Sequence, residues 1–225
     1  MRQGKISNLL TEEYLGKRAR RADRSETLRI LRRAGKENPP IEGDEIPPDL
    51  QAIKRELLVR RYLAGKIPRI DGRGIYAFFL TNPAALNGVA IDPSGLLYLG
   101  MTESSLDIRN HFTHMHSGFS TLRRSLGALL KQELHLHATP RAIGASPTNV
   151  RNYRFLDADE ERLTTWMTNH LAYGFAIVEN EVKLIERLLI RDMQPPLNLK
   201  GWSNPQRRHL RVLRDVCRDE ARNER

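Results

Sequence analysis

The architecture of this chain is set by residues 74–100, which read GIYAFFLTNPAALNGVAIDPSGLLYLG. The aromatic and apolar run at 76–81 predicts a buried strand, and residues 96–99 predict a second one. The connection at 82–95 contains two prolines and two glycines, which is typical of a loop. The unit opens on Gly74-Ile75-Tyr76 and closes on Tyr98-Leu99-Gly100. We therefore expect a hairpin-like pair of strands bracketed by two short motifs.

Helices are predicted around this pair from apolar residues that recur at helical spacing and from prolines and glycines that end each run. The predicted helices lie at about residues 8–34, 49–64, 104–116, 120–134, 158–170, 180–193 and from 205 to near the C-terminus, and a further strand lies at 172–178. The expected fold is α+β: a small, mostly antiparallel three-stranded sheet flanked by helices, with helical N- and C-terminal extensions.

Three regions are expected along the chain. Residues 1–69 form a basic helical N-terminal region with a Pro-rich linker, residues 70–202 form the domain that carries the motifs, and residues 203–225 form a basic C-terminal helix. A chain of 225 residues is long enough for one good core with such extensions.

Composition narrows the class of protein and its partner. The chain has 40% hydrophobic and 28% charged residues and no apolar run of membrane-spanning length, so we expect a soluble protein. A single cysteine, Cys217, excludes an internal disulfide, and no signal segment follows the first residues, which favours the cytoplasm. The formal charge of +10 indicates a polyanionic partner, most often nucleic acid. Residues 1–36 hold eleven Lys or Arg against four Asp or Glu, and residues 207–225 hold seven against four, so both ends can hold phosphates.

Glu186 is the residue whose position is most informative. In a helix at 180–193 it lies among Val182, Ile185, Leu189 and Ile190, within an apolar stripe rather than on the solvated face. A carboxylate taken out of water is costly unless a cation, a metal ion or hydrogen-bond donors compensate for its charge. Periodicity alone leaves two interpretations open, a buried ion pair with an arginine and a functional carboxylate.

The order of these parts resembles the GIY-YIG nuclease superfamily over residues 72–200. The run ERLLIRDMQPPLN, from Glu186 to Asn198, is similar to its C-terminal signature, in which a metal-binding glutamate precedes a proline and an asparagine. The resemblance implies that Glu186 binds one Mg²⁺ or Mn²⁺ ion per active site and that Asn198 braces the site by hydrogen bonding. From its position alone, Asn198 is a loop residue that caps backbone groups.

The resemblance also implies roles for three residues that follow the second motif. Arg109 corresponds to the phosphate-binding arginine of the superfamily, one residue further from the motif than usual. His111 forms a His-Phe pair similar to one in the superfamily, whereas His116 falls on the same helical flank as Arg109. Either histidine can orient the nucleophile or steady the leaving oxygen, and either can be a plain surface residue.

Tyr76 and Tyr98 carry the hydroxyls that face the active site in the superfamily. They position the attacking water or accept its proton, and an ordinary phenol requires a nearby positive charge to do so. Without the resemblance, both are core aromatics. Family members often carry a lysine directly after the glycine of the second motif, but this chain has Met101, so a cationic helper is missing there.

Further basic residues are expected to contact the nucleic-acid backbone. The segment 120–125 offers a helix N-terminus, hydroxyls and two arginines. The expected contacts are Arg123, Arg124, Lys200, Arg207 and Arg208.

The sequence therefore predicts a Mg²⁺-dependent endonuclease that hydrolyses DNA. One such site cuts one strand per encounter, so simultaneous cleavage of both strands would require a homodimer. A non-catalytic nucleic-acid-binding protein that keeps the fold is the alternative, favoured by Met101 and by the long 82–95 connection. An interaction domain whose charge only keeps it soluble is a third interpretation.

Overall fold

The computed structural model describes residues 48–224, apart from 108, 110, 113–115 and 143–146. The helix predicted at 8–34 and most of the Pro-rich linker lie outside the described residues. The chain divides into two compact units, residues 1–51 and 52–225, and the second contains both sheets. The C-terminal helix belongs to the same unit as the sheet.

The main sheet has four antiparallel strands in the order β1-β6-β2-β3. These are β1 (Arg61–Leu63), β2 (Gly74–Leu80), β3 (Leu96–Thr102) and β6 (Leu171–Ile177), and a separate two-stranded sheet pairs β4 (Ala138–Thr139) with β5 (Arg154–Phe155). The three strands expected from the sequence are present.

The prediction of a three-stranded sheet was wrong by one strand, because β1 was assigned to the end of a helix. That helix, α2 (Pro48–Val59), stops before residue 61, and Tyr62 pairs instead with Tyr173 of β6. The Tyr62 ring also stacks on Phe175, with 5.6 Å between ring centroids. The free edge of β6 therefore pairs with a segment that is too short to be recognised as a strand from the sequence alone.

The remaining helices follow the predicted order with two differences. The described helices after α2 are α3 (Thr121–Leu129), α4 (Pro147–Arg151), α5 (Asp157–His170), α6 (Val182–Met193) and α7 (Arg207–Asn223), with short 3₁₀ turns η1 (Ala64–Lys66), η2 (Pro83–Ala85) and η3 (Ser117–Phe119). First, α3 ends earlier than predicted, and α4 occupies part of a predicted loop. Second, the helix predicted at 104–116 is absent from the described residues there, which form turns and bends. No helix in the described part of the chain is long and apolar enough to cross a membrane.

Hydroxyl side chains bind backbone N–H groups where the predicted helix would begin. The backbone N–H of Ser104 donates to Thr102 Oγ1 and that of Asp107 donates to Ser105 Oγ, both at 3.2 Å. Bonds of this kind satisfy N–H groups that have no acceptor within the first turn of a helix. The backbone N–H of Leu106 donates to Gly72 O at 2.9 Å, which ties the turn to the residues before β2.

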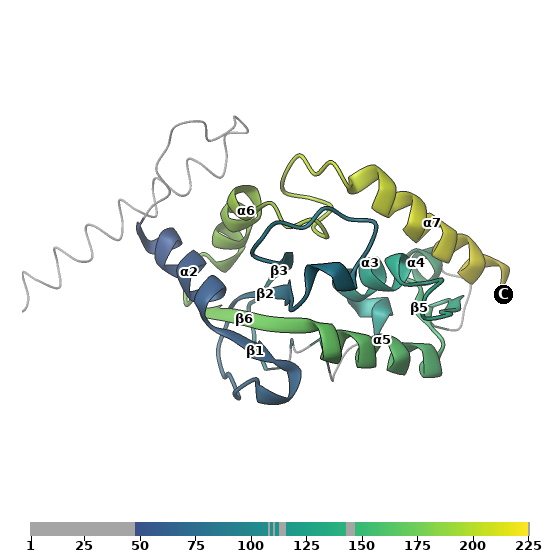
Figure 1. The fold of residues 1–225 in the computed structure, drawn as a ribbon, viewed down its shortest axis with the longest axis horizontal. Helices are drawn as coiled ribbons and strands as arrows, with labels where there is room; N and C mark the ends of the chain where they lie inside the picture. The colour runs from purple at the N-terminus through teal and green to yellow at the C-terminus, as the bar shows by residue number, and fades with distance from the viewer. Residues whose placement is uncertain (1–47, 108, 110, 113–115, 143–146, 225) are drawn as a thin grey trace, which may run out of the picture. The chain divides into compact units, whose positions relative to one another are not determined.

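Strand β2 lies at the centre of the core, since all seven of its residues are buried. Its Tyr76 and Phe78 face a cluster that includes Leu122 of α3 and Met167 of α5. In Figure 1, α2 and α6 lie together at one end of this unit, where Lys54 and Asp192 form an ion pair, and α3, α4, α5 and α7 gather at the other.

Two motif glycines are required by close approach. A Cβ on Gly74 would stand 2.2 Å from Ala176 O, and a Cβ on Gly100 would stand 2.6 Å from the Tyr76 ring. Tyr76 and Gly100 are register partners across β2 and β3. The glycine of the second motif therefore makes room for the tyrosine of the first.

Candidate active site

A cleft of about 1020 Å³ brings together three of the predicted catalytic residues: Tyr98, Glu186 and Asn198. Its walls come from α6 on one side and α7 on the other, with Tyr98 of β3, the end of α4 and the segment 198–201 between them. Residues more than 100 positions apart in the sequence thus line one open space.

Glu186 lies in the apolar stripe that the sequence predicted. Val182, Ile185, Leu189 and Ile190 are buried around it, and Glu186 itself is half-buried. Burial raises the pKa of its carboxyl group above 4.5. Among the described residues it has no hydrogen bond and no ion pair. Its charge is therefore not compensated by any hydrogen bond or ion pair from the described residues, and none of their arginines forms the buried ion pair with it.

The chemistry of this carboxylate fits a hard divalent cation. Mg²⁺ commonly uses one or two carboxylates, several waters and substrate phosphate oxygens as its ligands. The described residues contain no cluster of three or more His, Cys, Asp or Glu side chains that could hold a metal without substrate or water. A single unpaired carboxylate in an open cleft suits an ion that is completed by water and phosphate.

Asn198 fastens the edge strand of the sheet. Its Oδ1 accepts a hydrogen bond from the N–H of Leu99 at 2.9 Å, and its Nδ2 donates to the carbonyl of Leu99 at 2.7 Å. The next bond along, from Leu197 N–H to Leu97 O at 3.0 Å, continues the same pattern. Asn198 thus acts as a short extra strand beside β3 and fixes the backbone on the C-terminal side of Tyr98.

The two motif tyrosines differ in their access to the cleft. Tyr98 is half-buried and lines it, whereas Tyr76 is buried behind it and is absent from the lining. Their ring centroids are 6.4 Å apart. Burial and then the negative charge of Glu186 raise the pKa of Tyr98 to about 12. Burial also raises the pKa of Tyr76 well above 10. Both hydroxyls are therefore protonated at neutral pH.

His111 connects Tyr76 to the start of α3. Its Nε2 lies 2.9 Å from the Tyr76 hydroxyl, and its Nδ1 lies 2.9 Å from Ser120 Oγ. Burial and then the charge of Arg109 lower the pKa of His111 to about 3, so the ring is neutral. Of the two histidines left open by the sequence, this one contacts a motif tyrosine.

Arg109 lies in the turn after β3 rather than on a helix, and its N–H donates to Ser105 O at 3.3 Å. It is half-buried. Its positive charge opposes the rise in the pKa of both Tyr76 and Tyr98. The turn, not a helical register, therefore sets its position.

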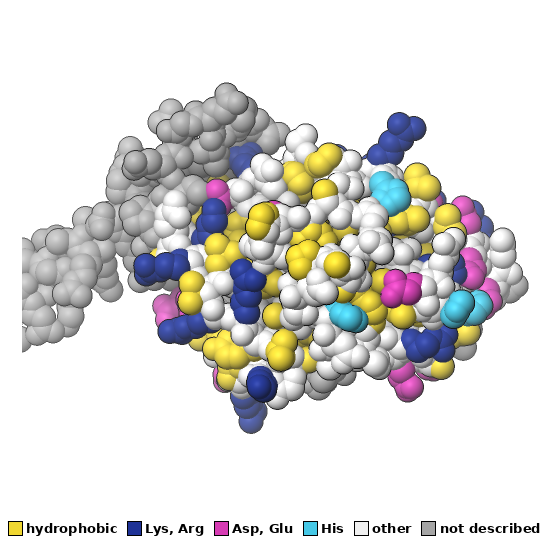
Figure 2. All heavy atoms as spheres, viewed as in Figure 1, with side chains coloured by type: hydrophobic (Ala, Val, Ile, Leu, Met, Phe, Trp, Pro, Cys, Tyr) yellow, Lys and Arg dark blue, Asp and Glu magenta, His cyan; other side chains and the backbone are white. Residues whose placement is uncertain are grey.

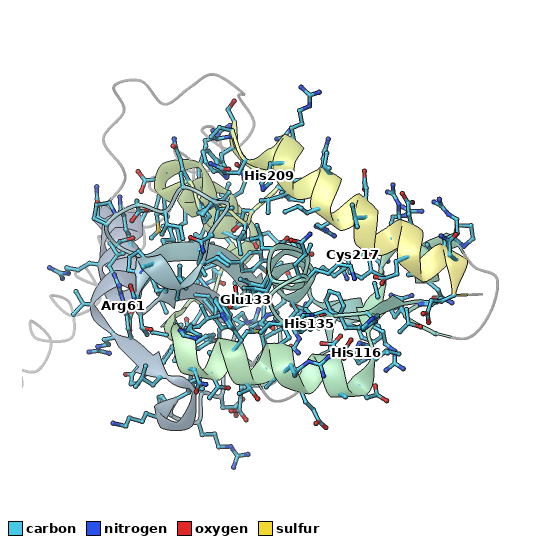
Figure 3. The ribbon with its side chains drawn as sticks, turned by 45° about the vertical axis from the view of Figure 1, so that its right-hand side comes forward. Arg61, His116, Glu133, His135, His209 and Cys217 are labelled. Carbon is cyan, nitrogen blue, oxygen red and sulfur yellow. The ribbon has the colours of Figure 1, made fainter. Side chains whose placement is uncertain are left out.

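His116, labelled in Figure 3, packs against the turn that follows it. It precedes η3, and its ring packs on Phe119 with 4.9 Å between centroids. Burial lowers its pKa, and it does not line the cleft. The structure thus brings His111 and not His116 to the tyrosines.

Arg123 and Arg124 do not lie where the sequence led us to expect them. Arg123 is 1% exposed, and its guanidinium forms an ion pair with Glu160 at 2.8 Å, so a nucleic-acid backbone has no access to it. Arg124 is also buried and donates to the carbonyls of Ser117 and Gly118 at 2.9 and 3.0 Å. Both arginines brace the fold beneath the site.

The cleft is lined by many more cations than acids. Lys200 lines it as expected, while Arg207 and Arg208 line a smaller neighbouring cavity of about 390 Å³ at the start of α7. Arg211 lines both. Cleft cations that the sequence reasoning missed are Arg151, Lys183, Arg187, Arg211, Arg214 and Arg218.

The lining therefore holds seven Lys or Arg side chains against two carboxylates, those of Glu186 and Asp215. On the face seen in Figure 2, by contrast, basic side chains are scattered among other residues. The missed arginines of α7 had a readable signal, because Arg211, Arg214 and Arg218 follow the predicted Arg207 at helical spacing.

Comparison with known proteins agrees with this geometry. The family model of the GIY-YIG catalytic domain matches residues 76–218, which is more than half of the chain. Neither the curated proteins nor the solved structures gave a match. The match includes Tyr76, Tyr98, Glu186 and Asn198, and it extends into α7. This chain therefore belongs to the GIY-YIG catalytic domain family.

Proposed function

We propose that this protein is an endonuclease that hydrolyses DNA phosphodiester bonds in the cleft between α6 and α7, with one Mg²⁺ or Mn²⁺ ion on Glu186. Membership of the family indicates nuclease-type activity. The observation that carries the proposal is the half-buried, unpaired carboxylate of Glu186 in a cleft whose lining is otherwise strongly basic. A polyanion compensates the basic side chains of the cleft, and a divalent cation bound to that polyanion compensates the carboxylate of Glu186.

Each residue of the site has a chemical task in this proposal. Glu186 would hold the divalent ion, which supplies positive charge to a phosphate oxygen. Arg109 binds the phosphate and stabilises the charge that develops on it. Asn198 keeps β3 in place, so that the Tyr98 hydroxyl stays at the mouth of the cleft.

Tyr98 orients the attacking water as a protonated phenol. Because the pKa of Tyr98 is about 12, very little of its hydroxyl is ionised at neutral pH. The hydroxyl is therefore better suited to passing a proton on than to removing one and keeping it. The water oxygen bonds to phosphorus, and the bond from phosphorus to the leaving sugar oxygen breaks. The water's proton passes through the Tyr98 hydroxyl to solvent, and the leaving oxygen takes a proton from solvent.

Tyr76 and His111 support this arrangement from behind. The chain from Tyr76 to His111 to Ser120 holds the Tyr76 ring, which lies against the Tyr98 ring. We propose a positioning role for both residues. Lys200, Arg207 and Arg208, together with the other cations of the cleft, would hold the backbone of the substrate on either side of the cleaved bond.

Incubation of supercoiled plasmid with the protein and Mg²⁺ tests the proposal. Nicked plasmid is expected with the wild type and with Glu179→Gln, which removes an exposed acid outside the cleft. No nicking is expected with Glu186→Gln. Salt-sensitive binding of DNA without cleavage by the wild type would instead support the non-catalytic alternative.

A further inference from the structure

The inner face of α7 contains a charged residue among apolar ones. Leu210, Cys217 and Ala221 are completely buried, and Cys217 is labelled on this helix in Figure 3. Positions 210, 214, 217 and 221 are spaced so that they share one side of a helix. Arg214 therefore belongs to the buried stripe of α7, as Glu186 belongs to that of α6.

Arg214 has no partner within the described part of the protein. It is half-buried and lines the cleft. It forms no hydrogen bond and no ion pair with any described residue, and the adjacent carboxylate of Asp215 is bonded to Arg218 at 3.0 Å instead. A guanidinium so placed is costly without an anion to compensate for its charge.

Arg214 lines the same cleft as Tyr98 and Glu186. Its positive charge opposes the rise in the pKa of Tyr98, Tyr153 and Cys217 and adds to the fall in the pKa of Arg124. Glu186 is not among its partners, since these two side chains do not form an ion pair although they line the same cleft. Two charges of opposite sign are thus kept apart, each open to a ligand.

We propose that Arg214 is a second phosphate-binding guanidinium of the active site, placed beside Tyr98 by the C-terminal helix. The inference rests on the proposed function. It adds to the proposed site a positive charge, which the side chain of Met101 does not supply. The planar donors of a guanidinium fit two phosphate oxygens at once. Arg214 would bind the phosphate from the α7 side, while Arg109 binds it from the turn after β3.

Two measurements on Arg214→Gln test this proposal, with Arg222→Gln as the matched control. Arg222 is exposed on the same helix and outside the cleft, so its replacement removes the same charge without touching the site. The first measurement is binding of a DNA duplex over a range of salt concentrations without divalent ion. Each lost phosphate contact lowers the slope of log K against log salt by about 0.9. That loss is expected for Arg214→Gln and not for the control.

The second measurement is the single-turnover cleavage rate at saturating protein. The loss of one donor to the developing charge commonly lowers such a rate by about 100-fold or more, and this is expected for Arg214→Gln. Arg214→Lys keeps the charge but not the planar fork, so it should retain the wild-type salt slope and an intermediate rate. If Arg214→Gln does not fold, the cleavage rate of Arg214→Lys tests the proposal in its place.

The outcomes separate this proposal from the proposed function. A wild type that does not cleave DNA removes the nuclease proposal, but the salt slopes still decide whether Arg214 binds phosphate. Cleavage that depends on Glu186 and is unchanged in Arg214→Gln removes the Arg214 proposal alone. Equal salt slopes for Arg214→Gln and Arg222→Gln, or an Arg214→Lys variant with the wild-type rate, would also overturn it.

Discussion

Replacement of Asn198 by alanine should destabilise the fold through the strand that carries Tyr98. Both hydrogen bonds from the Asn198 side chain go to the backbone of Leu99, which is completely buried at the open edge of the sheet. Each buried backbone group left without a partner costs about 1–3 kcal/mol. The two together predict a loss of about 2–6 kcal/mol in the free energy of unfolding. In a unit of this size, that loss lowers Tm by about 4–24 °C.

Urea denaturation and thermal melts measure this effect, with Asn87→Ala as the control. Asn87 is exposed in the connection between β2 and β3, so its replacement should change the free energy of unfolding by less than about 0.5 kcal/mol. A loss below that same value for Asn198→Ala would refute the reasoning, because the Leu99 groups would then be satisfied without the side chain.

Asn198→Asp provides a second check with a defined sign. The variant keeps an acceptor for the Leu99 N–H but places a carboxylate oxygen against the Leu99 carbonyl. That contact disfavours the charged form, so the pKa in the folded state should lie above that in the unfolded chain. Stability relative to the wild type should therefore recover as the pH falls and the carboxyl group regains a proton. A deficit that does not change with pH would contradict this account of the contact.

Three further predictions concern charged and titrating groups. Glu186→Gln should raise Tm at neutral pH without divalent ion, because burial raises the pKa of Glu186 above 4.5 and the charged form opposes folding. The difference in Tm between the two proteins should close as the pH falls through that raised pKa. Mg²⁺ should raise the Tm of the wild type only, and an equal rise in both proteins would count against the metal site. Arg123→Met should cost about 3–5 kcal/mol in urea denaturation, because it leaves Glu160 buried without its cation. A cost below about 1 kcal/mol would mean that Glu160 finds another partner. The wild type should lose stability as the pH falls from 6.5 toward 3, because burial lowers the pKa of His111 to about 3. His111→Gln should weaken that dependence, whereas His209→Gln, which removes an exposed histidine, should not.

Elements with a strong local pattern were predictable from the sequence. The apolar run of β2 and the stripes of α6 and α7 depend on residues within a few positions of one another, so the periodicity is visible in the chain itself. Glu186 was found in the same way, because its neighbours in the stripe are all apolar. Asn198 followed from its distance to Glu186 in the resemblance, and its hydrogen bonds to Leu99 supply the physical reason for that residue.

Features that depend on distant partners were not predictable. Strand β1 exists because β6 offers an edge more than 100 residues away in the sequence. Arg123 looked like a surface cation, but Glu160, 37 positions later, holds it in the interior. The described residues of the helix expected at 104–116 form turns instead, and the N–H of Leu106 donates to the carbonyl of Gly72, far earlier in the chain.

A common feature of Glu186 and Arg214 supports the proposal that the cleft binds a phosphodiester together with a divalent cation. Each charge sits on the buried stripe of its own helix, where an apolar residue would pack at lower cost. Salt-bridge formation across the cleft would relieve both costs, yet the two side chains do not pair. A simple anion would compensate Arg214 and leave Glu186 worse off, and a metal ion alone would do the reverse. A phosphate that carries a divalent ion satisfies both ends in one ligand, and its binding should therefore stabilise the folded protein more than phosphate or Mg²⁺ does separately.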